Sequence, residues 1–377
     1  MQAFRVLIRN FAAPLDIMEK LLTLLLLLVL MPGSASALDA DTTLVETDSE
    51  SRPEHGLLTT AKLETRFSWQ RDWAGSRKQA EKSGFFGDFI NVVLGGHIGS
   101  HWSYAYRQRL SKQTLSDGFF NATDWLYLTY KPNERWEFSA GKECLSIGGF
   151  AYDKAPIDVY HYSEYLSNIS CYQIGVSAAY NLSPADRFVV QATQSPFRGN
   201  AADMYGFGLQ WVGHHGCYNS LWSTQLFEAT PGHWIHFLAL GNRFDFGCGQ
   251  FVVDWTNRYA GGWGASFFGD FTLSGELHVQ PVRPLNLFVK YVWDHNSGDG
   301  SDFLVRPGTR LHHLQAGAEF YPLKGRRDVR FHASYARVWG TNGNPAGVWQ
   351  GNESIVKLGL TFRFDFLNLK QQFKFGK

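Results

Sequence analysis

Residues 355–365 read IVKLGLTFRFD, and apolar and polar side chains alternate along this stretch. The apolar positions are Val356, Leu358, Leu360, Phe362 and Phe364, and the positions between them are Lys357, Gly359, Thr361, Arg363 and Asp365. Successive side chains of a β-strand point to opposite faces of the sheet. The stretch therefore predicts a strand with one apolar, aromatic face and one polar face.

The same two-residue rhythm recurs through the chain, for example in residues 188–195, 205–211 and 271–279. Short connections, such as Gly99-Ser100, alternate with long ones, such as residues 295–311. Short turns on one side and long loops on the other are typical of bacterial outer-membrane barrels. We therefore expect an all-β fold, a transmembrane antiparallel β-barrel of about 16 strands with short periplasmic turns and long external loops.

The composition agrees with strands that face lipid on one side and water on the other. Aromatic residues make up 16% of the chain, 38 residues are glycine, and the mean hydropathy is only −0.23. A lipid bilayer offers no hydrogen-bond partner to a strand edge, so a sheet can cross it only when it closes on itself. These properties predict a protein that contacts the lipid of the outer membrane of a Gram-negative bacterium.

The N-terminus has the pattern of a secretory signal peptide. Lys20 precedes an apolar run over residues 21–31, and Ala35-Ser36-Ala37 supplies the small residues of a cleavage site. We expect a signal peptide over residues 1–37, with translation starting at Met1 or Met18. A periplasmic lead-in over 38–56, the barrel over 57–366 and a C-terminal tail over 367–377 are expected to follow.

Charge and cysteine content exclude several classes of partner. The full chain has a net charge of +1, and removal of residues 1–37 leaves a net charge of zero. No overall field therefore favours nucleic acid. The four cysteines fit no metal motif, so neither a metal site nor a cofactor is expected. Cys144 and Cys171 stand at the two ends of a long loop, which leaves a disulfide between them or two free thiols as alternatives.

If the apolar face meets lipid, the other face lines a lumen. The basic residues expected on that face are Arg107, Arg109, Arg187, Lys290, Arg330, Lys357 and Arg363. The acids expected there are Glu137, Asp254, Glu276, Asp294 and Glu319. Fixed cations in a lumen raise the local concentration of anions, and the planar fork of arginine matches oxyanions. The alternative is that these charges pair with the acids and select nothing.

The longest loop covers about residues 143–170. Its charged and titratable side chains are Asp153, Lys154, Asp158, His161 and Glu164. A loop of this length can fold into a barrel and constrict it, or it can pack over the barrel mouth. We expect the inward fold.

Residues 139–160, which read SAGKECLSIGGFAYDKAPIDVY, together with 172–177 (YQIGVS), 194–197 (QSPF) and 102–109 (WSYAYRQR), resemble the phosphate-selective porin O/P-like family. The resemblance implies a 16-stranded outer-membrane porin with an infolded constriction loop, typically a homotrimer. It implies passive diffusion of small hydrophilic solutes, with a preference for anions or phosphate in some members. The ladder of pore arginines and lysines of those members cannot be mapped onto this sequence residue by residue.

Two other functions remain open for a barrel of this kind. An outer-membrane hydrolase would need a nucleophile beside a base, but no motif brings one together, and we assign no catalytic residue. A barrel with a plugged lumen that binds a ligand is the second alternative. A soluble β-sandwich is a third, weaker one.

Overall fold

The computed structural model describes residues 56–111, 118–199, 203–259, 268–298 and 302–368. The expected signal peptide, nearly all of the lead-in and most of the C-terminal tail lie outside these residues. Among the residues described, no helix combines the length and apolarity needed to cross a bilayer.

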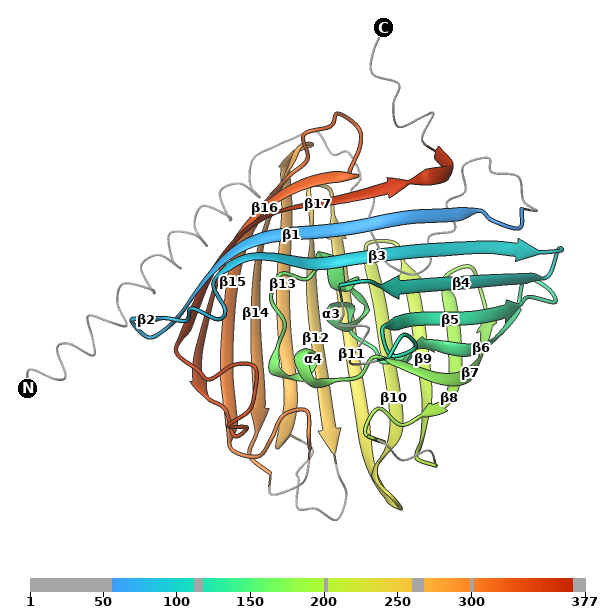
Figure 1. The fold of residues 1–377 in the computed structure, drawn as a ribbon. Coiled ribbons are helices and arrows are strands. Elements are labelled where there is room, and N and C mark those ends of the chain that lie inside the picture. Colours follow the sequence, from blue (N-terminus) through green and yellow to red (C-terminus); the bar gives the residue numbers. More distant parts are fainter. Residues whose placement is uncertain (1–55, 112–117, 200–202, 260–267, 299–301, 369–377) are drawn as a thin grey trace, which may run out of the picture.

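The described residues form sixteen long strands and a two-residue strand, β2 (Arg77–Lys78), in one antiparallel sheet (Figure 1). The long strands are β1 (Thr60–Ala74), β3 (Gly84–Ile98), β4 (Trp102–Arg109), β5 (Thr123–Tyr130), β6 (Trp136–Cys144), β7 (Tyr172–Asn181), β8 (Asp186–Gln194), β9 (Tyr205–His215), β10 (Tyr218–Thr230), β11 (His233–Phe246), β12 (Gly249–Tyr259), β13 (Asp270–Val282), β14 (Leu285–Asn296), β15 (Thr309–Phe320), β16 (Val329–Thr341) and β17 (Glu353–Asp365).

The sheet closes because the first and last strands pair with each other. β1 and β17 run antiparallel from Lys62 opposite Asp365 to Ala74 opposite Glu353, while the other edge of β1 pairs with β3. Each of the sixteen long strands thus has two neighbours, and the barrel wall that they form has no unpaired edge in the membrane. The predicted closed barrel of about 16 strands is confirmed. β1 begins at Thr60 rather than near Leu57.

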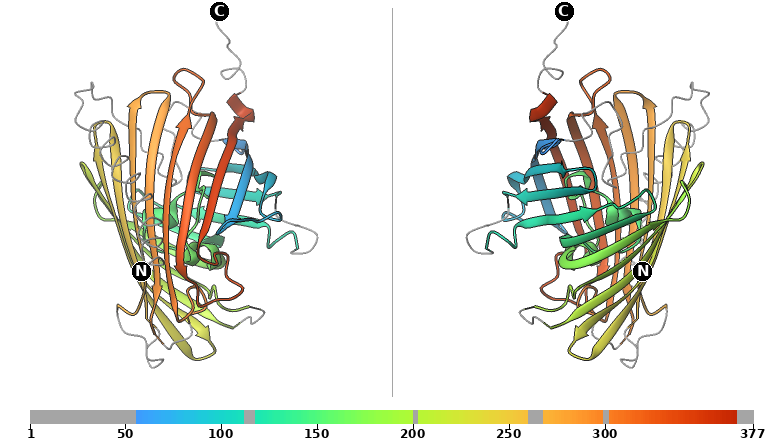
Figure 2. Two further views of the ribbon diagram at one scale, coloured as in Figure 1. Left: turned by 90° about the vertical axis from the view of Figure 1, so that its left-hand side faces the viewer. Right: turned by 90° about the vertical axis from the view of Figure 1, so that its right-hand side faces the viewer.

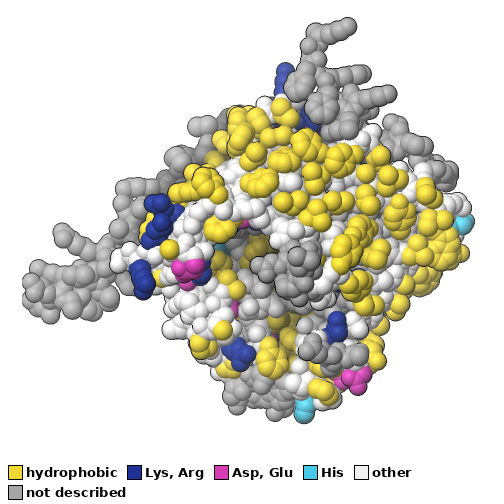
Figure 3. All heavy atoms as spheres, viewed as in Figure 1, with side chains coloured by type: hydrophobic (Ala, Val, Ile, Leu, Met, Phe, Trp, Pro, Cys, Tyr) yellow, Lys and Arg dark blue, Asp and Glu magenta, His cyan; other side chains and the backbone are white. Residues whose placement is uncertain are grey.

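Side chains alternate between the two faces of the wall as the sequence predicts. Leu358 of β17 is 47% exposed on the outside, whereas Thr361 on the inner face is buried. A space-filling view shows apolar side chains spread over the outer surface of the barrel (Figure 3). This outer surface is the one that contacts lipid.

The wall is not of even height. β4 to β8 contain 8 to 10 residues each, whereas most of the strands from β10 to β17 contain 12 or more. The side views show this lower wall opposite the taller one (Figure 2).

The connection between β6 and β7 lies inside the barrel (Figure 1). It contains α3 (Phe150–Asp153), the 3-10 turn η1 (Pro156–Asp158) and α4 (Glu164–Asn168). Its apolar side chains pack against Ile235, Phe237 and Ala239 on the inner face of β11. This contact explains why residues 230–243 do not alternate cleanly in the sequence: both faces of β11 are apolar, because one meets lipid and the other meets the loop.

Candidate functional site: the infolded loop and the inner wall

The infolded loop, residues 145–171, starts on the inner face of β8 and β10. The Ser146 backbone N–H donates to Oε1 of Gln191 at 2.8 Å, and the Gly148 N–H donates to Oγ of Ser223 at 2.6 Å. Leu145 and Ile147 enter the apolar cluster of β11. Polar and apolar contacts together hold the first part of the loop against the wall.

Two aspartates of the inner wall bind backbone N–H groups of the loop. Asp254 on β12 accepts from Phe150 at 3.0 Å and from Ala151 at 2.6 Å, at the start of α3. Asp294 on β14 accepts from Glu164 at 2.8 Å, at the start of α4. Carboxylates stabilise a helix start because the first N–H groups have no partner within the helix. The wall therefore caps both short helices.

The tip of the loop is held by arginines from the opposite part of the wall. Asp158 accepts from Arg330 of β16 at 2.6 Å and from Arg363 of β17 at 2.7 Å. Arg66 of β1 donates to the carbonyl oxygens of residues 157 and 159, both at 2.8 Å. Burial alone would raise the pKa of Asp158, but Arg363 and Arg330 hold it well below its usual value.

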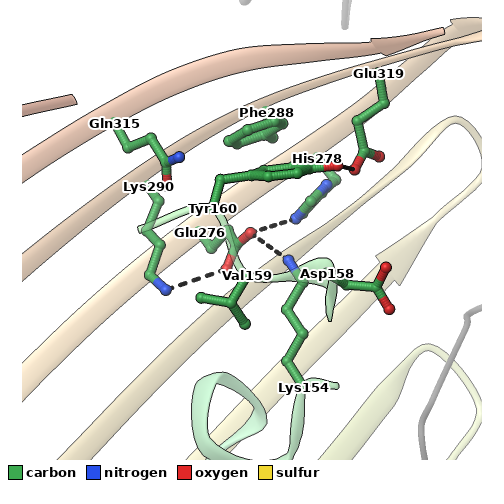
Figure 4. Close-up of a pocket in the computed structure, with 10 residues that line it drawn as sticks. All are labelled: Lys154, Asp158, Val159, Tyr160, Glu276, His278, Phe288, Lys290, Gln315 and Glu319. Carbon is green, nitrogen blue, oxygen red and sulfur yellow. Dashed lines mark hydrogen bonds and ion pairs between the residues drawn. The ribbon is translucent and has the colours of Figure 1, made fainter. Parts of the chain in front are cut away.

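A second ionic contact joins the middle of the loop to β13. Lys154 lies 2.8 Å from Oε1 of Glu276, which is also 2.6 Å from Nε2 of His278. Lys290 approaches the other oxygen of Glu276 at 4.0 Å. These side chains surround a small cavity between loop and wall, with room for about one water molecule (Figure 4). The site is too small for a transported solute.

A buried pair of imidazoles links the loop to β15. Nε2 of His161 lies 2.9 Å from Nδ1 of His313, whose Nε2 is 3.2 Å from Asp294. The ring of Trp349 covers His161 at 4.5 Å. Burial, followed by the neighbouring His313, holds the pKa of His161 well below its usual value. His161 is therefore neutral at pH 7. Glu164 is buried as well, and it accepts from Asn168 at 2.9 Å.

The basic residues predicted on the inner face all lie there, but they do not form one group. Arg107 and Arg109 meet at Asp124 of β5, with shortest distances of 3.0 and 2.9 Å to the same oxygen. The guanidinium of Arg107 also lies 3.5 Å from the ring centroid of Trp125. Arg187 pairs instead with Glu137, at 3.0 Å.

Two residues that organise this wall, Arg66 and Asp124, were not predicted from the sequence. Arg66 obeys the alternation of β1, so its face could have been assigned once the bounds of that strand were known. Asp124 could not, because the register between β4 and β5 shifts between Arg107 and Gln108. The shift breaks the two-residue rhythm at that point, as a β-bulge does.

Of the two alternatives for Cys144 and Cys171, a disulfide or two free thiols, the structure has the second. Both are free thiols. Cys144 pairs with Tyr172 in the β6–β7 register, and the Leu145 N–H donates to the Cys171 carbonyl at 2.8 Å. The two cysteines are thus one position out of register in the ladder, and the Cys144 thiol contacts the Tyr152 hydroxyl at 3.7 Å instead. In the described part of the chain, no three His, Cys, Asp or Glu side chains are arranged to hold a metal ion.

A closed antiparallel barrel of sixteen strands, with a long loop folded into a charged lumen, defines the class of outer-membrane porins. The chain is similar in fold to an anion-selective porin from Comamonas acidovorans (TM-score 0.55, 12% identity, covering 81% of this chain and 99% of that one). It is also similar to OmpF of Salmonella typhi, solved with daunomycin (TM-score 0.54, 13% identity, covering 80% of this chain and 97% of that one). A third similar structure is OmpT of Vibrio cholerae in a trimer form (TM-score 0.52, 14% identity, covering 81% of this chain and 98% of that one).

Residues 62–226 match the sequence model of the phosphate-selective porin O and P family. None of the curated proteins compared with the sequence matches it. The protein is therefore an outer-membrane porin that allows passive diffusion of small solutes, and it is not an enzyme.

Proposed function

We propose that this porin favours small anions. The observation that carries the proposal is that Arg107 and Arg109 share a single carboxylate oxygen of Asp124. Two cations on one anion leave an excess positive charge on the inner wall. Arg109 remains 17% exposed, so part of this charge faces the lumen. A desolvated wall strengthens the field of such a charge and raises the local anion concentration.

Lys357 of β17 supports the same proposal. It lies on the inner face, half-buried, and forms no ion pair with any residue that the structure describes. The acids nearest the loop are engaged, since Asp158 binds two arginines and Asp254 and Asp294 accept backbone N–H groups. The lumen-facing positive charges are therefore less compensated than the count of acids suggests.

The test is the reversal potential of single channels in a salt gradient. The wild-type channel should show the sign of an anion-selective pore. Arg109→Gln combined with Lys357→Gln should move the potential toward zero, whereas Arg327→Gln, on a periplasmic turn, should leave it unchanged. A cation-selective wild-type channel, or a double variant with the wild-type potential, contradicts the proposal.

We propose further that the protein is a homotrimer that assembles through the wall of β4 to β8. A strand needs about 9 to 11 residues to cross the hydrocarbon layer. β4 and β5 have only 8 residues each. This wall is nevertheless apolar outside, with Leu126, Ile174 and Val176 exposed by 46%, 42% and 55%. A low apolar wall is better covered by another copy of the chain than by lipid.

Cross-linking can test this assembly. In a background with the native cysteines changed to serine, Val176→Cys on β7 should be cross-linked by a trifunctional maleimide to a species of three chains. Leu273→Cys on the taller wall should not. Equal cross-linking at both positions, or none at Val176, argues against this interface.

The ends of the chain complete the proposal. We propose that residues 1–37 are a signal peptide, that residues 38–56 form a periplasmic lead-in, and that the segment after the barrel, residues 367–377, is a periplasmic tail. The apolar run over residues 21–31, followed by the small residues of a cleavage site, supports the signal peptide. The last strand, β17, ends at Asp365, at the end of the barrel where the short periplasmic turns lie, which supports the periplasmic tail.

A further inference from the structure

Three arginines lie on the lipid-facing side of the taller wall, near the external ends of their strands. Here we call Arg71 of β1, Arg310 of β15 and Arg337 of β16 the outer arginine patch. Each strand end concerned adjoins a long connection, which marks the external side of the barrel. The patch thus lies at the level of the outer leaflet of the membrane.

The register and the ring contacts place these side chains on the outside. Arg310 is paired with His295 of β14, and His312 follows it on the same face, stacked 5.5 Å from Trp339. Arg337 stands between Tyr335 and Trp339, which are 48% and 36% exposed. These rings belong to the aromatic girdle that marks the edge of the hydrocarbon layer.

Arg71 extends the patch across the closing seam of the barrel. It is exposed, with its guanidinium 5.4 Å from the ring centroid of Trp69. The neighbouring β2 adds the exposed Arg77 and Lys78. In Figure 3, basic side chains gather at the end of the barrel where β2 lies.

The positive charge of the patch is not compensated by the protein. Arg337 donates to Oγ of Ser354 at 2.7 Å and to the side-chain oxygen of Asn352, both neutral acceptors. Within the described ranges, no carboxylate forms an ion pair with Arg71, Arg310 or Arg337. An unpaired charge on the lipid face is costly unless it lies at the interface and finds a partner there. An anion of the membrane surface can supply the missing partner.

We propose that the outer arginine patch binds the phosphate groups of a phosphorylated glycolipid of the outer leaflet. Arginine forms two parallel hydrogen bonds to a phosphate, and basic side chains beside a membrane attract anionic headgroups. Arg310 is paired with Thr341, so the Cα atoms of Arg310 and Arg337 are separated by about 14 Å of sheet. Two side chains at this separation can bind two phosphates of one sugar headgroup, while the aromatic girdle contacts its acyl chains.

The test uses the purified full-length protein in detergent, with bis-phosphorylated lipid A as the probe and its dissociation constant as the readout. Arg310→Gln combined with Arg337→Gln should weaken binding at least tenfold, because each lost charge-assisted contact is worth about a factor of ten or more. Arg327→Gln, which changes an exposed arginine on a periplasmic turn, is the matched control and should bind as the wild type does.

Two further arms identify the source of the anion. Lipid A without its phosphates should bind the wild type weakly, and inorganic phosphate should not compete at equal concentration. Equal affinity of the double variant and the wild type, or equal binding of the dephosphorylated lipid, overturns the proposal. Full competition by inorganic phosphate also overturns it as a lipid site. The reversal potential of the double variant should stay that of the wild type, which keeps this result separate from the proposed anion selectivity.

Discussion

Asp158, at the tip of the infolded loop, lies 2.6 Å from Arg330 on the wall of the barrel, and Arg363 reaches its other oxygen at 2.7 Å. The loop leaves the wall at β6 and returns to it at β7, so this contact fixes the loop across the lumen from its two ends. One carboxylate between two guanidinium groups therefore contributes to the position of the loop tip, and with it to the aperture.

Asp158→Asn should therefore release the loop tip and leave Arg330 paired only with Glu319 and Arg363 only with Glu64. Removing one partner of a buried ion pair costs about 3 to 5 kcal/mol. We expect noisier single-channel currents and a reversal potential moved further toward anion selectivity. Asp328→Asn, on a periplasmic turn, is the control. An Asp158→Asn channel with the current noise and potential of the wild type would show that the other contacts of the loop, such as that of Arg66, hold the tip without this bridge.

The same contact predicts how the loop responds to acid. Because the folded pKa of Asp158 is lowered, the bridge contributes stability above the unfolded carboxyl value of about 4, and this contribution is lost as the pH falls through the lower folded value. Protease cleavage within the loop should thus stay rare between pH 7 and 5. Cleavage that already rises at pH 6 in the wild type would contradict this assignment.

Gly241 of β11 allows the loop to approach the wall. A β-carbon on Gly241 would lie 2.7 Å from the α-carbon of Gly149 and 3.0 Å from Oδ1 of Asp254. Gly241→Ala should push α3 away from its cap on Asp254 and change the conductance. Gly275→Ala is the control, because a β-carbon there meets no atom within 4 Å. Equal conductance in both variants would mean that the loop tolerates the displacement.

Alternation in the sequence was enough to predict the barrel and the faces of its strands. Lys357 and Arg363 lie on the inner face, as residues 355–365 indicate, because a strand in a closed barrel has lipid on one side and the lumen on the other. The alternation also placed Arg107 and Arg109 on one face of their strand, and in the structure both contact Asp124. These properties are local, so a single strand reveals them.

What the sequence could not predict depends on contacts between distant segments. Nothing in residues 143–170 indicates that Asp158 would meet β16 and β17, or that Asp254 would cap α3. The apolar inner face of β11 interrupts the alternation of polar and apolar residues, and that interruption alone does not indicate the loop that covers the strand. The partner of Arg107 and Arg109 stayed hidden because Asp124 lies beside the register shift between β4 and β5.

The apolar contact between loop and wall predicts an asymmetric effect of two neighbouring substitutions. Phe237 is fully buried against the loop, whereas Leu238 faces the opposite side of β11. Phe237→Ala removes packing worth about 3 to 5 kcal/mol and should make the loop accessible to protease in the intact barrel. Leu238→Ala should leave loop cleavage unchanged. The idea fails if both variants, or neither, are cleaved in the loop.

Asp153 predicts a pH dependence of selectivity. Burial raises its pKa to about 6, against the attraction of Arg243. The folded pKa thus lies above the unfolded value of about 4, so the folded protein takes up a proton between pH 7 and 5 and becomes more stable relative to the unfolded chain as the pH falls through 6. The same proton removes one negative charge from the infolded loop.

The reversal potential of the wild-type channel should consequently move toward anion selectivity as the pH falls from 7 to 5. Asp153→Asn should show the low-pH potential already at pH 7 and change less on acidification, because the asparagine carries no charge at either pH. Asp328→Asn should keep the pH response of the wild type. If Asp153→Asn still shows the full shift between pH 7 and 5, another carboxyl group of the lumen titrates in this range, and the charge of Asp153 does not reach the path of the ions.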